Sequence, residues 1–206
     1  MVSDGTYTES LLIDEANLTL KSENGTDSTT IQNVGNAPSG QQTGIDIDAN
    51  NFTLGGEEGH GFTIVGGTAG RLIQLTHGES GVEISYNEID TTGVASIGIN
   101  IGAGGATALT ITNNIFIADE DDTYQDWPIS ASAGAGFIAD LIISDNEFTG
   151  SGTPHKYGAA IDLVDVQVVS LTESVIANNT ISDFDRGIIL GTDDNNTSNM
   201  ALTVAP

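Results

Sequence analysis

The chain has 206 residues, of which 29 are acidic and only four are Lys or Arg, so its formal net charge is −25. This charge disfavours binding to nucleic acids and to anionic membrane surfaces, because both depend on Lys and Arg side chains that neutralise phosphates. The absence of Cys excludes disulfides, a thiol nucleophile and Cys-ligated zinc.

The composition predicts one all-β domain that spans residues 1–206. The chain contains 26 Gly, only 5% of its residues are aromatic, and no long segment has apolar residues at helical spacing. Short aliphatic stretches separated by Gly, Asn, Asp, Ser and Thr are typical of strands joined by turns. No stretch approaches the roughly 20 apolar residues that a membrane-spanning helix needs.

The first expected strands, at 11–13 and 18–20, follow a turn at 5–9 with the sequence Gly-Thr-Tyr-Thr-Glu. After them a phrase recurs in which an aliphatic pair at alternate positions precedes an Asn and then an Ile or Phe. The alternation predicts a strand, and the Asn predicts a tight corner that leads into the next strand. The copies are Ile45, Ile47, Asn50 and Phe52; Val82, Ile84, Asn87 and Ile89; Leu109, Ile111, Asn114 and Phe116; Leu141, Ile143, Asn146 and Phe148; and, more faintly, Ile176, Asn179 and Ile181.

Repetition of one strand-rich unit at intervals of roughly 20–35 residues is typical of a β-solenoid. We expect a right-handed parallel β-helix of seven to nine coils, because crossovers between parallel strands are right-handed. Further strands are expected at 62–65, 72–75, 97–101, 160–163 and 187–190. The Asn residues of the phrase are predicted to stack as an internal ladder in which each amide bonds the next coil.

The turn at 5–9 and the repeats at 82–89 and 109–116 resemble the N-terminal element and the repeat of right-handed parallel β-helix proteins of the pectate-lyase-like superfamily. The resemblance covers nearly the whole chain, and it implies the fold. It implies no single activity, because that superfamily includes lyases, hydrolases, esterases, phage tailspikes and non-catalytic surface proteins.

The two ends of the solenoid lead to an expectation about partners. In the resembled proteins an amphipathic helix usually precedes the Gly-Thr-Tyr-X-Glu element and covers the first coil, whereas here only a few residues precede it. An uncapped end exposes unpaired backbone groups and apolar side chains. We therefore expect end-to-end self-association or a neighbouring domain of a larger polypeptide.

An acidic segment at 118–128 interrupts the repeats and carries two candidate sites. Tyr124 and Trp127 offer a platform on which a sugar ring can stack, and the alternative is that they seal the acidic loop against the β-helix. Local carboxylate density predicts a calcium site, although its spacing matches neither an EF-hand nor a nonapeptide calcium repeat, and a solvated, salt-tolerant loop is the alternative. The candidate calcium ligands are Asp119, Glu120, Asp121, Asp122 and Asp126.

A second interruption, at 150–158, carries the candidate catalytic residues of a polysaccharide lyase. Such an enzyme needs a base to remove a proton next to a uronate carboxylate, and a cation to neutralise that carboxylate. His155, Lys156 and Tyr157 offer these groups, with Arg186 further along the chain. The alternative is a solvated turn. A glycoside hydrolase would need two carboxylates that flank the scissile bond. The segment Gly59-His60-Gly61 looks like a fragment of the polygalacturonase pattern, but the order of the motifs in this chain departs from that pattern.

Two functions follow from these observations. The leading hypothesis is a non-catalytic extracellular or cell-surface module, such as an adhesin, filament or surface-layer component that contacts glycans. The acidic excess favours a saline or halophilic source, because salt screens the self-repulsion. The alternative is a carbohydrate-active enzyme, a polysaccharide lyase or glycoside hydrolase, whose site lies between the two interrupting segments.

Overall fold

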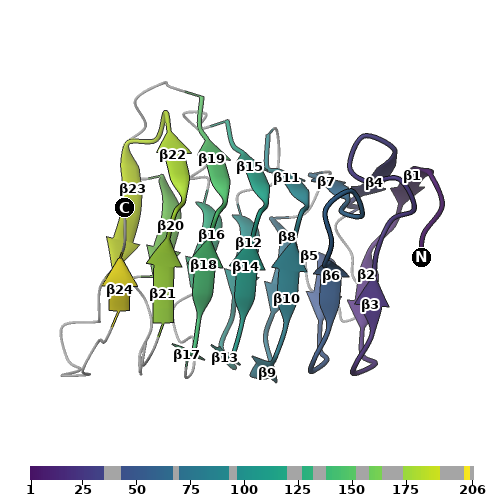
Figure 1. Ribbon diagram of the computed structural model, residues 1–206, viewed down its shortest axis with the longest axis horizontal. Coiled ribbons are helices and arrows are strands. Elements are labelled where there is room, and N and C mark those ends of the chain that lie inside the picture. The colour runs from purple at the N-terminus through teal and green to yellow at the C-terminus, as the bar shows by residue number, and fades with distance from the viewer. Residues whose placement is uncertain are drawn as a thin grey trace.

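Three long sheets run along the molecule, and the chain adds one strand to each of them as it winds around a common axis (Figure 1). The computed structural model describes residues 1–34, 43–66, 70–92, 97–119, 127–131, 138–151, 158–163, 174–190 and 202–204. For residues 202–204 it describes the backbone alone. Every strand pair within these ranges is parallel, so each strand leads around a corner into the next sheet.

We name each long sheet after its first strand. The β1 sheet contains β1 (Gly5–Thr8), β4 (Thr29–Gln32), β7 (Thr63–Val65), β11 (Glu88–Asp90), β15 (Ile115–Ile117), β19 (Glu147–Thr149) and β22 (Thr180–Ser182). The β2 sheet contains β2 (Leu11–Ile13), β5 (Thr43–Ile47), β8 (Arg71–Leu75), β12 (Ile97–Ile101), β16 (Trp127–Ala131), β20 (Ala159–Leu163) and β23 (Arg186–Leu190).

The β3 sheet contains β3 (Thr19–Leu20), β6 (Thr53–Gly55), β10 (Glu83–Ser85), β14 (Thr110–Thr112), β18 (Ile142–Ser144), β21 (Ser174–Ala177) and β24 (Leu202–Val204). A short fourth sheet, formed by β9 (Glu79–Ser80), β13 (Ala106–Thr107) and β17 (Ile138–Ala139), occupies the corner between the β2 and β3 sheets. Within the described ranges no helix is long and apolar enough to cross a membrane.

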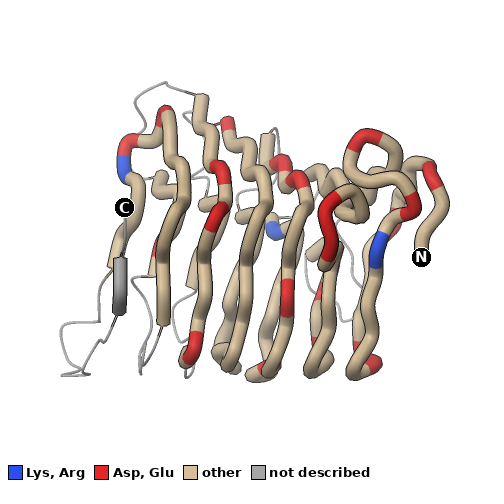
Figure 2. The backbone as a smooth tube through the Cα atoms, viewed as in Figure 1, with Lys and Arg blue, Asp and Glu red and all other residues tan. Residues whose placement is uncertain are grey.

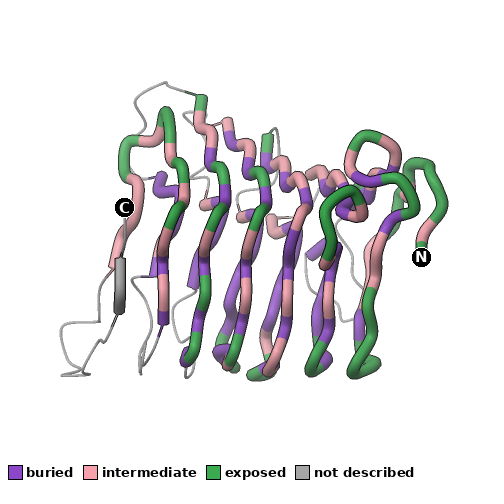
Figure 3. The backbone as a smooth tube through the Cα atoms, viewed as in Figure 1, coloured by how far each residue is buried: buried purple, intermediate pink, exposed green. Residues whose placement is uncertain are grey.

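The core is a column of aliphatic side chains stacked in register from coil to coil. Ile45 of β5 pairs with Ile73 of β8, and the column continues through Ile99, Ile129 and Ile161, all of them fully buried. Figure 3 shows the resulting buried segments along the strands of successive coils. Burial of one such side chain contributes about 1.5–3 kcal/mol, so the stack is the main source of stability.

These observations confirm the predicted right-handed parallel β-helix. Each long sheet has seven strands among the described residues, so the number of coils lies at or slightly below the lower limit of the seven to nine expected. Strands occupy the positions expected at 11–13, 18–20, 62–65, 72–75, 97–101, 160–163 and 187–190, with bounds that shift by at most one residue. Aliphatic alternation therefore located the strands correctly, because only one face of each strand meets the core. The expected turn at 5–9 is wrong, because Gly5–Thr8 form strand β1 and pair with β4.

The sharp corner between the β3 and β1 sheets uses two adjacent residues with different tasks. The first residue adopts a left-handed backbone conformation, with φ between 55° and 60° at Tyr86, Asn113, Asp145 and Asn178. The second is the Asn of the repeated phrase, whose side chain turns inward. The sequence pattern had assigned the corner conformation to that Asn, whereas the structure places it one residue earlier and leaves the Asn free to bond across coils.

The inward-turned amides of Asn87, Asn114, Asn146 and Asn179 form the predicted ladder. Asn114 Nδ2 donates to the carbonyl oxygen of Ile84 (2.8 Å) and to Asn146 Oδ1 (3.1 Å), and Asn114 Oδ1 accepts the backbone N–H of Asn87 (3.0 Å). The same contacts recur at the next coil, where Asn146 bonds Asn179. Each amide thus satisfies backbone groups that the corner removes from the strand ladders.

The prediction that Asn50 belongs to this ladder is wrong. Asn50 is exposed, and its Oδ1 accepts the backbone N–H of Ser80 at a different corner (2.8 Å). The reason is the position of its strand, because Ile45 and Ile47 lie in the β2 sheet. The aliphatic pairs of the other copies lead through the β3 sheet.

Replacement of one ladder amide tests this account of the corner. We expect Asn114→Ala to lower the free energy of unfolding by about 3 kcal/mol, because it leaves the buried Ile84 carbonyl and Asn87 N–H without partners. Urea unfolding followed by circular dichroism measures the change. The control is Asn113→Gly at the exposed neighbour, where glycine accepts the left-handed conformation and the expected change is within about 0.5 kcal/mol. Equal effects of the two variants would contradict a specific role for the amide.

Candidate functional site

Most residues that were predicted to form sites lie outside the described part of the chain. These are Glu120, Asp121, Asp122, Tyr124, Asp126, His155, Lys156 and Tyr157. The calcium site and the lyase residues therefore remain predictions. Of the described candidates, Asp119 is half-buried after β15, Trp127 is half-buried at the start of β16, and Arg186 is exposed at the start of β23.

A row of polar side chains crosses the outer face of the β2 sheet. Asp46 lies between the inward-facing Ile45 and Ile47, so its side chain points away from the core. The register aligns it with Gln74, and the row continues to the other members. The polar row consists of four side chains that are each at most 7% exposed: Asp46, Gln74, Asn100 and Ser130.

The buried polar atoms of this sheet include Asp46 Oδ1, an acceptor, and Trp127 Nε1, a donor, which have no hydrogen-bond partner in the described part of the chain. By contrast, Gln74 Oε1 accepts from Thr43 Oγ1 (3.2 Å) and from Arg71 Nη1 (3.1 Å). Buried polar groups are nearly always paired, so unpaired ones indicate a place where a ligand can supply the missing bonds.

The starts of three neighbouring strands place different side chains along one edge of this sheet. Arg71 of β8 pairs in register with Ile97 of β12, and Ile97 pairs with Trp127 of β16. All three residues are half-buried. This edge therefore presents a cation, an aliphatic side chain and an aromatic ring next to one another, and the polar row lies beside it.

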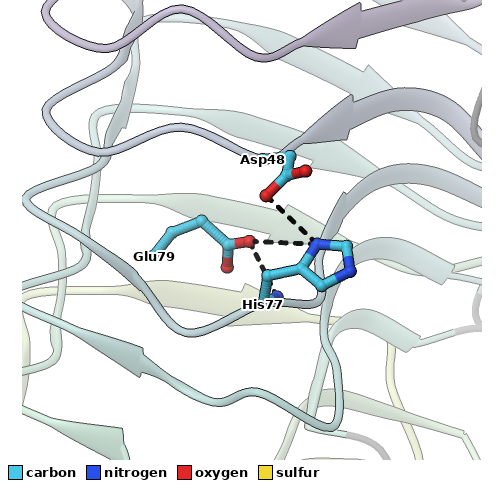
Figure 4. Close-up of side chains that lie close together, drawn as sticks. All are labelled: Asp48, His77 and Glu79. Atoms are coloured by element: carbon cyan, nitrogen blue, oxygen red, sulfur yellow. Dashed lines mark hydrogen bonds and ion pairs between the residues drawn. The ribbon is translucent and has the colours of Figure 1, made fainter.

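A second cluster forms where the chain leaves the β2 sheet. Asp48 follows β5, His77 follows β8 one coil later, and Glu79 begins β9. His77 Nδ1 lies 3.2 Å from Asp48 Oδ1 and 3.9 Å from Glu79 Oε1. In Figure 4 both carboxylates face the same ring nitrogen, and the other ring nitrogen points away from them.

The turn itself positions Glu79. Its Oε1 accepts the backbone N–H of His77 (2.8 Å) and that of Thr76 (3.4 Å). Gly78, between His77 and Glu79, has φ of +85°, a conformation that favours glycine. Glu79 Oε2 is buried and has no hydrogen-bond partner among the described residues. Burial raises the pKa of the Glu79 carboxyl, although its backbone hydrogen bonds and the nearby His77 act in the opposite direction.

The cluster lines an open pocket of about 300 Å³. Asp14, from the preceding coil, and Asn50 add two more oxygen-bearing side chains to its wall. Figure 2 shows that acidic residues are spread over the coils and basic residues are few. Among the described cations, Lys21 is engaged with Glu57 (Nζ to Oε1, 3.3 Å) and Arg71 with Gln74, and neither lines this pocket. The pocket is therefore an environment for a cation.

Sequence reasoning missed this cluster because its members come from different coils. The three His residues, at 60, 77 and 155, are far apart in the sequence and follow no metal-binding spacing. The signal was present in the register, since Ile47 pairs with Leu75 and places Asp48 beside the residues that follow β8. An alignment of the coils on their aliphatic pairs, instead of a search for local motifs, would have found it.

The raised pKa of Glu79 leads to a prediction about stability and pH. Because the folded state favours the protonated carboxyl, the stability that this group contributes is fully present below its ordinary pKa and is lost as the pH rises through the raised pKa. Glu79→Gln cannot titrate. In the presence of a chelator, we expect the free energy of unfolding of the variant, minus that of the parent, to increase over the pH range that begins at the ordinary pKa of a Glu carboxyl and extends upward. Urea unfolding across that range measures it, and a constant difference would contradict the prediction.

Comparisons with known proteins place the fold but not the family. No protein-family model matches the sequence, and no curated protein sequence matches it. Among solved structures, a pectin methylesterase in complex with a hexasaccharide matches with a TM-score of 0.51, and a variant of a pectin methylesterase in complex with another hexasaccharide matches with 0.50. In each case the sequence identity is 11%, and the match covers 90% of this chain and 70% of the other. The chain therefore shares the right-handed parallel β-helix fold of pectin-processing enzymes.

Proposed function

We propose that this chain is a carbohydrate-active protein of the extracellular space or cell surface that binds a glycan along the outer face of the β2 sheet. The observation that carries the proposal is the half-buried edge formed by Arg71, Ile97 and Trp127, which lies beside the polar row of that face. The hexasaccharide complexes of the matching structures support a glycan as the ligand class.

The chemistry of the row suits a sugar. Sugar hydroxyls are both donors and acceptors, so they can bond polar groups that border the row, including the donor groups of the half-buried Arg71 guanidinium. The half-buried indole of Trp127 offers an apolar face for a sugar ring together with a polar edge. Neighbouring strands lie about 4.8 Å apart, so the row repeats polar groups at a regular interval along the molecule.

The net charge decides which glycan fits. A formal charge of −25 repels a polyanion such as a free polyuronate, and the only cation along the described Arg71–Trp127 edge is Arg71 itself. A neutral glycan, or one whose carboxyl groups are esterified, escapes this repulsion. We therefore propose a glycan with few free carboxylates, for which pectin with a high degree of esterification is the nearest model.

The two segments that were predicted to hold the site directly precede strands of the β2 sheet in the chain. Residues 120–126 precede β16, and residues 152–157 precede β20. These two strands are neighbours in the β2 sheet. The earlier hypothesis of a non-catalytic adhesin or filament module stays a prediction, as do calcium binding and a saline source.

Two substitutions on this face test the proposal. We expect the parent chain to bind esterified or neutral oligosaccharides in isothermal titration calorimetry, and Arg71→Gln and Trp127→Ala each to weaken that binding about fivefold, since stacking and desolvated polar contacts carry the affinity. Lys21→Gln is the matched control, because it removes the same charge from a residue engaged with Glu57 away from this face. Circular dichroism confirms that each variant is folded.

Three results would contradict the proposal. The first is the absence of binding to every neutral and esterified oligosaccharide. The second is an equal loss of affinity in Lys21→Gln, which would show that charge alone matters. The third is preferential binding of fully de-esterified polyuronate, which would overturn the argument from net charge. The same samples, assayed for release of methanol and for new reducing or unsaturated ends, show whether binding leads to turnover.

A further inference from the structure

We propose that Asp48, His77 and Glu79 form a binding site for one divalent transition-metal ion, with Zn²⁺ as the representative ion, at the corner that follows the β2 sheet. The proposal does not depend on glycan binding, because the three side chains lie on a different part of the surface from the Arg71–Trp127 edge. It rests on the arrangement of the donor atoms, on one buried unpaired oxygen and on the open pocket in front of them.

The donor atoms are already gathered. The nitrogen and oxygen ligand atoms of the three residues all lie within 4.8 Å of one another. Zinc binds nitrogen and oxygen ligands at about 2.0–2.2 Å, so two atoms bound to one tetrahedral ion lie about 3.4 Å apart. The distances from His77 Nδ1, 3.2 Å to Asp48 and 3.9 Å to Glu79, bracket that value. Only small side-chain movements are needed, and the side chains of Asp48 and His77 are 47% and 62% exposed and free to make them.

Ordinary ion pairing does not satisfy this cluster. His77 Nδ1 carries at most one proton, so it can donate to Asp48 or to Glu79 but not to both. Glu79 Oε2 is a second, independent observation, because it is buried on a side chain that is only 2% exposed and it lacks a hydrogen-bond partner among the described residues. An ion held between the carboxylates and the imidazole replaces the proton on Nδ1 and neutralises the buried carboxylate.

The surroundings supply what a metal site requires beyond its ligands. The backbone N–H groups of His77 and Thr76 hold Glu79 Oε1 in place, which is the kind of support that orients metal ligands. The pocket of about 300 Å³ leaves room for bound water, and Asp14 in its wall is a candidate for a further oxygen ligand. One coil of the helix therefore contributes His77 and Glu79, and the two preceding coils contribute Asp48 and Asp14.

The donor set also selects the class of ion. Calcium and magnesium prefer oxygen ligands alone, whereas an imidazole nitrogen with carboxylates suits zinc, manganese, cobalt, nickel and copper. We therefore expect a preference for transition metals over calcium and magnesium. This site is separate from the calcium site predicted at Asp119 to Asp126, which lies largely outside the described residues.

Titration of the chelator-treated full chain with Zn²⁺ in isothermal titration calorimetry, in the absence of any glycan, tests the proposal. We expect one equivalent to bind, and His77→Gln and Glu79→Gln each to lower the affinity at least tenfold. His60→Gln is the matched control, because His60 also lies near a carboxylate, 4.0 Å from Glu57, but faces only one. This variant should bind like the parent. His77 is largely exposed, so its replacement should leave the unfolding temperature of the metal-free chain unchanged.

A spectroscopic measurement separates a built site from scattered surface carboxylates. Co²⁺ bound through an imidazole and carboxylates gives visible absorption of low-coordinate cobalt, which should appear with the parent and with His60→Gln and be lost with His77→Gln. The proposal is overturned if the parent binds no Zn²⁺, if His77→Gln and His60→Gln bind equally, or if Ca²⁺ competes with Zn²⁺ at equal concentration. Because no sugar is present, failure here leaves the glycan proposal intact, and the reverse also holds.

Discussion

In-register pairing between successive coils is the constraint on which the whole molecule depends. One coil cannot bury its own aliphatic side chains, so each coil is stable only against its neighbours, and a shift of one residue would turn an Ile into the solvent. The column through Ile45, Ile73 and Ile99 fixes this register from the inside. The amide ladder fixes it again at the corner, because each Asn bonds the coils on both sides of it.

The same register creates both candidate sites. On the outer face of the β2 sheet it aligns polar side chains that are 26 to 30 residues apart in the chain, and so turns isolated residues such as Asp46 and Gln74 into a continuous row. At the adjoining corner it brings Asp48 of one coil against His77 of the next. Function in this fold therefore depends on positions across coils, and a residue's neighbours along the sequence contribute less. The fold alone does not assign activity, because matching structures at 11% identity share the backbone path and little else.

The strands could be predicted because their aliphatic alternation repeats, and the ladder could be predicted because Asn recurs at the end of that pattern. The sites could not, because the coils differ in length. Ile47 pairs with Leu75, and Leu75 pairs with Ile101, so consecutive coils advance by 28 and then 26 residues. No fixed period therefore reveals that Asp48 meets His77. The misassigned Asn50 has the same origin, since its local phrase matched the pattern but its coil position did not. The candidates at 119–126 and 155–157 were chosen for local density of polar groups, and they stay predictions.

Disulfide cross-linking between coils tests the register most directly. Because the chain contains no native Cys, the introduced Cys residues can pair only with each other. Glu88 and Ile115 are paired across neighbouring coils, and Ile115 is paired with Glu147 one coil further. We predict that the double variant Glu88→Cys with Ile115→Cys forms an intramolecular disulfide under mild oxidation, since the strands lie about 4.8 Å apart. The double variant Glu88→Cys with Glu147→Cys, at about twice that distance, should remain reduced. Efficient closure of the second pair, or failure of the first, would contradict the in-register stack.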